Sequence, residues 1–245
     1  MKKKRPTIAV LDVAGAIDEA KAMALLITIR NTDWRKKNII GLIVRVGSNG
    51  GSLGAAQAIC EGIETVRSEV EIVTVALATE TAMSAGFYVA LACDIVVATP
   101  AATVGSVGAI IPKFSGFPLA DKLGISFNPA QSGIGKGSLH PLSAPNAASD
   151  ALLDLLVADI GEQFFDWVRL RRKASDATMA LIGDGRMLSG RQAECLGLVD
   201  VCGGFYTAIA KVCEQASQEQ AALIWLNPPS VSMMGKIVKS IKAFF

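Results

Sequence analysis

Three apolar segments alternate with helical patterns in the first part of the chain, and this alternation constrains the fold more than any other feature. TIAVLDV (residues 7–13), IIGLIVRV (39–46) and EIVTVALA (71–78) are rich in valine and isoleucine. Between them, residues 18–30 and 53–68 carry apolar side chains at helical spacing. Strands with continuous apolar runs are typical of a parallel sheet that is covered on both faces. The sequence therefore predicts βαβ units with right-handed crossovers and an α/β fold.

The alternation continues beyond residue 80 in shorter segments. The longest amphipathic helix is expected at 147–173, with these apolar side chains in or near one face: Leu152, Leu155, Leu156, Ile160, Phe164, Trp167 and Val168. Further helices are expected at 116–124, 175–182, 189–196 and 204–219, and further strands at 94–99, 125–131, 196–203 and 221–226. No internal repeat or low-complexity linker divides the chain. We therefore expect one domain over residues 1–226 and a distinct tail at 227–245.

Composition argues against several classes of protein. The net charge of +2 gives no electrostatic case for nucleic-acid binding. The basic start MKKKRP leads into a strand that contains Asp12, which favours a short basic segment over a secretory signal. No apolar run is long enough for a transmembrane helix. The five cysteines include no CxxC pair, which favours buried free thiols in a reducing compartment over a metal site: Cys60, Cys93, Cys195, Cys202 and Cys213.

The tail has a cationic, amphipathic pattern. Its apolar residues lie roughly on one helical side, and its lysines recur every third position: Met233, Met234, Ile237, Val238, Ile241 and Phe245, with Lys236, Lys239 and Lys242. Such a helix suits a membrane surface, a partner subunit or a face of its own domain. We expect a cytoplasmic protein that touches the membrane peripherally through this tail.

Ser84 occupies the most informative turn of the chain, within TAMSAGFYVALACD (81–94). A strand-like run leads into this turn, and an apolar run at helical spacing leads out. The start of a helix presents free N–H groups and the positive end of its dipole, which suits a nucleophile whose product is an oxyanion. Serine is also a common helix N-cap, and the turn alone leaves both interpretations open.

A serine nucleophile needs a base within hydrogen-bonding reach. The only histidine, His140, lies in a loop between a leucine and a proline. The alternative is Lys136, which is flanked by Gly135 and Gly137. A lysine base must be neutral, and so it must be desolvated. For either residue alone, a solvated loop side chain is the simpler interpretation.

A glycine-rich turn, GSNGGS (47–52), follows the second strand. Its backbone N–H groups suit a phosphate or an oxyanion. The turn is not a P-loop, since no GK[ST] sequence follows.

Three motifs occur together and in one order: VRVGSNGGS (44–52), ETAMSAGFYVALACDIVVATPAATVGSVGAI (80–110) and QSGIGKGS (131–138). This combination resembles the signal peptide peptidase A family of serine proteases, which use a Ser-Lys dyad. The resemblance extends over roughly residues 7–205. It implies a fold of the Clp protease and crotonase type, with repeated ββα units and an outlying helical segment.

The resemblance assigns roles to individual residues. Ser84 would be the nucleophile and Lys136 the general base. The N–H groups of Gly50 or Gly51, together with that of Ala85, would hold the oxyanion. Ser106, in VGSVG, matches a family serine near the dyad and would have an auxiliary role.

Three residues depart from the family pattern. Asn49 stands where proline is usual, Ala85 where the first glycine after the nucleophile is usual, and Gly137 where aspartate is common. None of these departures removes a member of the dyad. They bear on loop geometry and on rate.

The expected function is a serine endopeptidase that hydrolyses apolar peptides, such as cleaved signal peptides, in or near the membrane. Family members assemble into rings or domes, so a homo-oligomer is expected, and no metal or cofactor is required. In such a ring, the dyad could be completed only on assembly. Alternatively, a short chain that carries both Ser84 and Lys136 could complete its site alone, with neighbouring subunits lining the pockets. Alternatives are a Clp-like or phage head-maturation protease, a crotonase-like enzyme, or a non-catalytic assembly protein.

Overall fold

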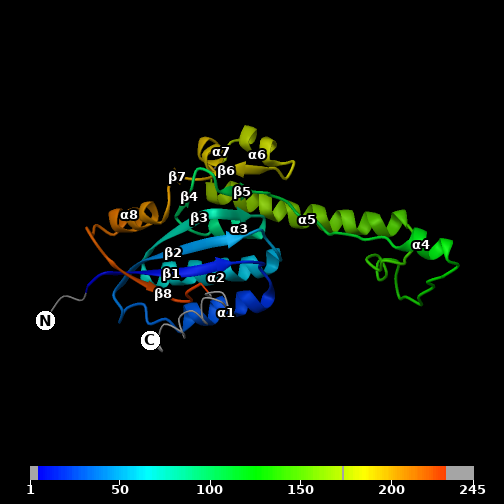
Figure 1. Cartoon of the computed structure of the whole chain (residues 1–245), viewed down its shortest axis with the longest axis horizontal. Coiled ribbons are helices and arrows are strands. Elements are labelled where there is room, and N and C mark those ends of the chain that lie inside the picture. The colour runs from blue at the N-terminus through cyan, green and yellow to red at the C-terminus, as the bar shows by residue number, and fades with distance from the viewer. Residues whose placement is uncertain (1–4, 173, 230–245) are drawn as a thin grey trace, which may run out of the picture.

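The computed structural model describes residues 5–172 and 174–229, which are organised around an eight-stranded sheet (Figure 1). The strand order is β6-β5-β3-β2-β1-β8, with β4 paired to β3 and β7 paired to β4. All pairs are parallel except β5 with β6. The strands are β1 (Thr7–Ala14), β2 (Ile39–Ser48), β3 (Val73–Met83), β4 (Ile95–Ala98), β5 (Thr103–Gly105), β6 (Met187–Ser189), β7 (Val201–Cys202) and β8 (Ala222–Trp225). The expected α/β fold with a largely parallel sheet is confirmed.

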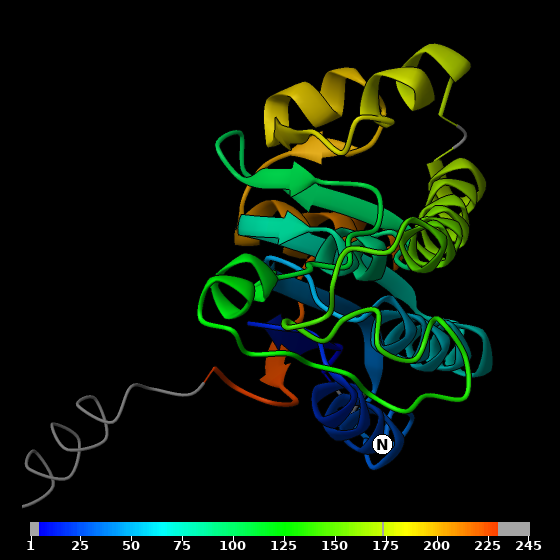
Figure 2. The same cartoon turned by 90° about the vertical axis from the view of Figure 1, so that its right-hand side faces the viewer.

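Helices cover the two faces of the sheet unequally (Figures 1 and 2). One face packs against α1 (Glu19–Arg30), α2 (Leu53–Val70), α3 (Ala85–Ala90) and the second half of α5 (Ala147–Arg172). The other face packs against α8 (Phe205–Gln215). The remaining helices are α4 (Phe117–Lys122), and α6 (Asp176–Ile182) and α7 (Gly190–Cys195) near β6.

Burial on both faces explains the continuous apolar runs of the strands. In β1, Ile8 and Val10 belong to the cluster under α8, whereas Ala9, Leu11 and Val13 belong to the cluster under the opposite helices. Because successive strand residues point to opposite faces, each position of such a strand has to be apolar.

β3 is the strand that carries the chain to its most unusual turn. Its residues Val75–Ala78 pair with β4, and Thr81–Met83 pair with β5. These two successive partners let β3 extend beyond the end of β4. As a result, β3 and β5 end side by side, and α3 begins directly after that point.

The second half of α5 is anchored on α3. Arg171 donates from Nε to the Leu91 carbonyl at 2.7 Å and from Nη2 to the Ala92 carbonyl. A cation at the C-terminal end of a helix also interacts favourably with the helix dipole. One turn earlier, the Trp167 ring stacks on Tyr88 at a centroid distance of 5.1 Å, and its Nε1 donates to the Tyr88 carbonyl at 3.1 Å.

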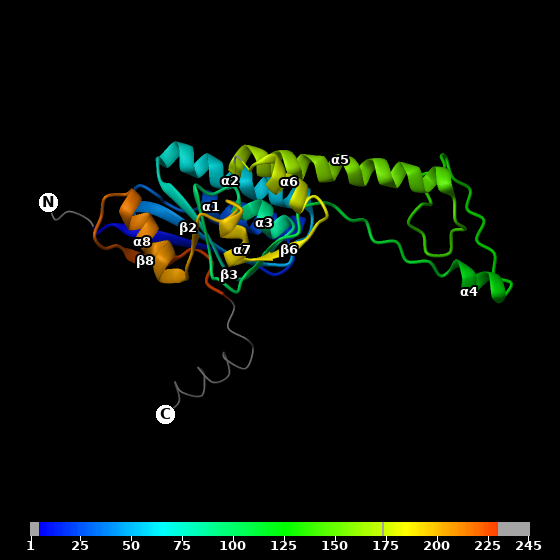
Figure 3. The same ribbon diagram turned by 90° about the horizontal axis from the view of Figure 1, so that it is seen from above.

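The first half of α5 and the segment before it project away from the sheet (Figures 1 and 3). We call residues 110–158 the arm. It exposes an unusual number of large apolar side chains: Ile110, Phe114, Leu119, Leu123, Ile125, Ile134, Leu139, Leu152, Leu155 and Leu156. Of the apolar residues predicted for the long helix, Phe164 and Val168 are buried, whereas Leu152, Leu155 and Leu156 are exposed within the described part of the chain.

Two local expectations are wrong. Residues 125–131 form no strand, because they lie in the arm, where no sheet edge is available to pair with them. Conversely, β5 and β6 lie where no strand was expected. Each has three residues, too few for a recognisable alternation, and they form through pairing with each other and with β3.

The cysteines are free thiols: Cys60, Cys93 and Cys213 are buried, Cys202 is half-buried and Cys195 is exposed. Burial raises the pKa of Cys93 to about 12, which keeps this thiol protonated and unreactive. The prediction of buried free thiols is thus confirmed for three of the five.

The amphipathic tail falls largely outside the described residues, which end at 229, and its predicted role stays a prediction. Within 5–172 and 174–229, none of the helices combines the length and the apolar character that crossing a bilayer would need.

The anchor of α5 on α3 should contribute strongly to stability. We expect Arg171→Ala to lower the free energy of unfolding by about 2–3 kcal/mol, because it removes charge-assisted hydrogen bonds to two carbonyl groups. Urea denaturation of the variant and the wild type measures the difference. The matched control is Arg169→Ala, which loses only an exposed pair with Asp166 and should cost less than about 0.5 kcal/mol. Equal effects of the two substitutions would contradict the anchor.

Candidate active site

Ser84 is held in a strained backbone conformation between β3 and α3. Its φ is 50° and its ψ is −128°, in a region that L-residues rarely occupy. Such a conformation costs about 1–3 kcal/mol and persists only where the surroundings impose it. Here Ser84 N–H donates to the Gly105 carbonyl at 2.8 Å, and Tyr88 N–H donates to the Ser84 carbonyl at 3.0 Å. The Ser84 side chain makes no capping hydrogen bond to α3, so the structure does not support the interpretation of Ser84 as a simple N-cap.

The glycine-rich turn after β2 lies directly against Ser84. A Cβ atom on Gly50 would stand 2.7 Å from Ser84 Cβ and 3.1 Å from Ser84 Oγ. A Cβ atom on Gly51 would stand 2.1 Å from the Ile17 carbonyl oxygen. Both glycines also have positive φ, 120° and 149°. The turn therefore requires glycine at both positions, at 50 for close approach to Ser84 and at 51 for close approach to the Ile17 backbone.

Two backbone N–H groups beside Ser84 are left without a partner in the described part of the chain. Gly50 N–H donates to Ser48 Oγ at 3.1 Å, which occupies it. In the bridge between this turn and Ile17, the Ile17 N–H donates to the Gly50 carbonyl and the Ser52 N–H donates to the Ile17 carbonyl. The N–H of Gly51 takes part in neither bond. Ala85 is the first residue of α3, so its N–H has no acceptor within the helix. Of the expected oxyanion donors, the geometry thus favours Gly51 and Ala85 over Gly50.

Asn49 and Ala85, two of the departures from the family pattern, are accommodated structurally. The Asn49 Oδ1 atom accepts a hydrogen bond from Thr81 Oγ1 at 3.0 Å, which ties the glycine-rich turn to β3. Ala85 is buried, and its side chain is accommodated. The next position has no room for a side chain, because a Cβ atom on Gly86 would stand 2.8 Å from the Ser48 carbonyl oxygen.

Ser106 lies beside Ser84 at the end of β5. Met83 and Gly105 are paired in the sheet, so the two serines follow neighbouring positions. Ser106 also has a positive φ of 53°, and its N–H donates to the Arg186 carbonyl at 3.0 Å. Its placement fits the auxiliary role expected for it.

A groove of about 450 Å³ opens at Ser84. It runs between α2, α5 and the segment that follows β5, and it is lined by Gly51, Ser52, Leu53, Gly54, Gln57, Ser84, Ala85, Gly108, Ala109, Ile110, Ile111, Ile160 and Gln163. Its walls are mostly apolar. Sequence reasoning missed the residues from α2 and α5, because nothing in the chain's spacing indicates which helices flank the turn.

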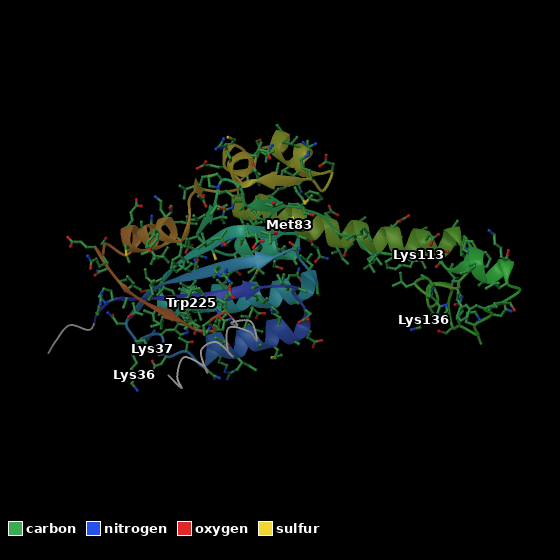
Figure 4. All side chains as sticks on the ribbon, viewed as in Figure 1. Lys36, Lys37, Met83, Lys113, Lys136 and Trp225 are labelled. Atoms are coloured by element: carbon green, nitrogen blue, oxygen red, sulfur yellow. The ribbon has the colours of Figure 1, made fainter. Side chains whose placement is uncertain are left out.

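Lys136 lies far from Ser84 within one chain. Figure 4 labels Met83, which directly precedes Ser84, at the sheet, and Lys136 near the far end of the arm. The Lys136 side chain is exposed. His140, the other candidate base, also lies in the arm, where its ring stacks on Phe127 at 3.8 Å. A single chain therefore brings neither candidate base to Ser84, and the expectation that it could complete its own site is not met.

The loop that carries Lys136 is nevertheless firmly attached to the first turn of α5. Ser149 Oγ donates to Ser138 Oγ at 2.6 Å, and Ser138 Oγ donates to the Gly135 carbonyl at 2.7 Å. Ser138 and Ser149 are buried in an otherwise exposed segment. This hydroxyl chain fixes the backbone next to Lys136 to the end of the long helix.

The arrangement suits the stabilisation of an oxyanion next to a serine hydroxyl. Within residues 5–172 and 174–229, no cluster of three or more histidine, cysteine or acidic side chains suited to a metal ion occurs.

Comparisons with known proteins agree with this geometry. The model of peptidase family S49 matches residues 67–219. A protein of Synechocystis sp. that is named as a protease is 29% identical over 229 residues, covering 94% of this chain and 78% of its own length. The chloroplastic serine protease SPPA of Arabidopsis thaliana is 27% identical over 94% of this chain, which spans only 36% of that relative. The 1510-N membrane-bound stomatin-specific protease, solved with a substrate peptide, shares the fold with a TM-score of 0.56 and 14% identity over 98% of this chain.

The strain at Ser84 gives a testable expectation about stability. We expect Ser84→Gly to be more stable than Ser84→Ala by about 1 kcal/mol or more, because only glycine adopts this conformation without steric cost. Urea denaturation of the two variants measures the difference, and both should lose labelling by a fluorophosphonate. Equal stability of the two variants would show that the turn is not strained.

Proposed function

This chain belongs to peptidase family S49, a family of serine peptidases, and we propose that it hydrolyses peptide bonds with Ser84 as nucleophile and Lys136 as general base. Neutral Lys136 takes the Ser84 proton as the hydroxyl oxygen attacks the peptide carbonyl. The N–H groups of Gly51 and Ala85 stabilise the oxyanion that forms. Protonated Lys136 then gives its proton to the leaving amine, and water releases the acyl group from Ser84 by the same steps.

One observation supports this proposal more than any other. A serine with a strained backbone stands beside two N–H groups that have no partner in the described part of the chain, at the mouth of a largely apolar groove. Strain of this kind persists where it positions a reacting group. A scaffold protein would have no need of it.

We propose further that Lys136 reaches Ser84 from a second copy of the chain. A lysine base requires desolvation, and Lys136 is exposed in the single chain. The arm that carries it exposes Ile110 at 83% and Phe114 at 81%, with Leu155 at 69% on the same projection. Apolar surface of this extent indicates a protein interface. A copy docked on the arm would cover these side chains and desolvate Lys136 at the same time.

The groove supports extended apolar peptides as substrates, with leftover signal peptides as the proposed physiological class. The apolar walls of the groove are formed by Leu53, Ile110, Ile111 and Ile160. Residues 109–111 belong to no helix or strand, and within the described chain their backbone N–H groups donate no hydrogen bond. Such a segment can pair with an incoming peptide as an added strand.

Co-expression of two inactive variants tests the shared site. Ser84→Ala and Lys136→Ala should each be inactive alone. In mixed oligomers about a quarter of the sites combine an intact Ser84 from one copy with an intact Lys136 from the other, and activity on a fluorogenic apolar peptide should return to about that fraction.

The matched control pairs Lys136→Ala with the double variant Ser84→Ala/Lys136→Ala, which supplies no lysine and should stay inactive. Full activity of Lys136→Ala alone would remove the lysine from the mechanism. A lack of recovery in the mixed oligomers would place both dyad members in one chain.

The tail supports a peripheral position on the membrane. We expect deletion of residues 228–245 to shift the protein from the membrane fraction to the supernatant, because the apolar face and the lysines of this segment suit an anionic bilayer surface. Fractionation of cells that express the full and the shortened chain measures the shift. Unchanged fractionation would end this part of the proposal.

A further inference from the structure

Two glutamine side chains connect the helices on either side of the groove. Gln57 belongs to α2 and Gln163 to α5, and Gln57 Nε2 donates to Gln163 Oε1 at 3.4 Å. Both residues line the groove that opens at Ser84. The amide pair therefore spans the space between the two helices.

The pair lies one helical turn beyond the apolar walls, measured from Ser84. On α2, Leu53 follows the glycine-rich turn directly, and Gln57 comes four residues later on the same side of the helix. On α5, Ile160 precedes Gln163, and the helix continues from there toward the C-terminal end of α3, away from Ser84. One turn corresponds to about 5.4 Å along a helix axis. Leu53 and Ile160 thus form the near part of the groove, and the two amides form its far end.

The hydrogen-bonding groups of this far end are already engaged. Gln163 Nε2 donates to Asp159 Oδ2 at 2.9 Å, so the chain of bonds runs from Gln57 through Gln163 to a carboxylate. Both glutamines are exposed, so these bonds lie at the solvent-facing end of the groove, where they hold the two side chains across it.

We propose that Gln57 and Gln163 close the pocket that receives the side chain preceding the scissile bond and thereby set the length of side chain it accepts. This inference rests on the proposed function. The near part, between Leu53 and Ile160, accommodates a side chain of the length of leucine or methionine. An aromatic ring would have to displace the amide pair. The two glutamines are specificity-determining residues, and they take no part in the chemical steps.

Peptides that differ only in the residue before the scissile bond test this inference. We expect the wild type to cleave leucine and methionine peptides well and the phenylalanine peptide poorly. In Gln57→Ala and Gln163→Ala, the ratio of kcat/KM for phenylalanine to that for leucine should rise by about tenfold or more, within the range known for pocket enlargement. Both sites are exposed helix positions where alanine is well tolerated, so the variants should fold.

Two controls separate pocket length from other effects. Gln163→Leu keeps the bulk of the side chain and should keep the wild-type ratio. Gln218→Ala makes the same change at an exposed position outside the groove and should leave both rates unchanged.

A ratio that stays unchanged in both alanine variants, with activity on leucine retained, would overturn the inference and leave the proposed function intact. Failure of the wild type to cleave any of the peptides would overturn both. Loss of activity on every peptide in the alanine variants, with folding intact, would also contradict a role limited to specificity.

Discussion

The attachment of α5 to α3 is the contact on which the arrangement of the site depends. Arg171 binds the carbonyls at the C-terminal end of α3, and Trp167 stacks on Tyr88 one turn earlier. Ser84 starts the same short helix at its other end. The anchor thus fixes α5 relative to Ser84, and the groove between α2 and α5 takes its width from that attachment. The same rigid helix also sets the direction in which the arm leaves the sheet.

Much of the sheet and the turn at Ser84 could be predicted from the sequence, because local chemistry determines them. Strands buried on both faces need continuous apolar runs. Glycine is needed at position 50, where the backbone touches Ser84, and at position 51, where it touches Ile17. Residues 125–131 have the composition of a strand and yet form none, since strand formation depends on a neighbouring edge that the arm does not have. β5 and β6 show the converse, where pairing creates strands from segments too short to be recognised.

The separation of Ser84 from Lys136 could not be predicted, for a physical reason. Spacing along the chain limits how far apart two residues can be, but it does not fix the direction of the segment between them. Here that segment leaves the sheet after β5 and returns along α5 (Figures 1 and 3). Likewise, periodicity identified an apolar face on α5 without showing that half of it has no partner within the described chain.

Under the proposed mechanism, the division of the site between Ser84 and Lys136 has a consequence for control of the reaction. The strain at Ser84 and the two N–H groups beside it are present in the single chain, so the proposed oxyanion site is preorganised there. Lys136 is exposed in the single chain, and a lysine that acts as a base needs desolvation. Under the proposed mechanism, association of copies therefore supplies the one missing element, and hydrolysis depends on assembly. Under the same proposal, a chain that has not yet assembled leaves the peptides around it uncut.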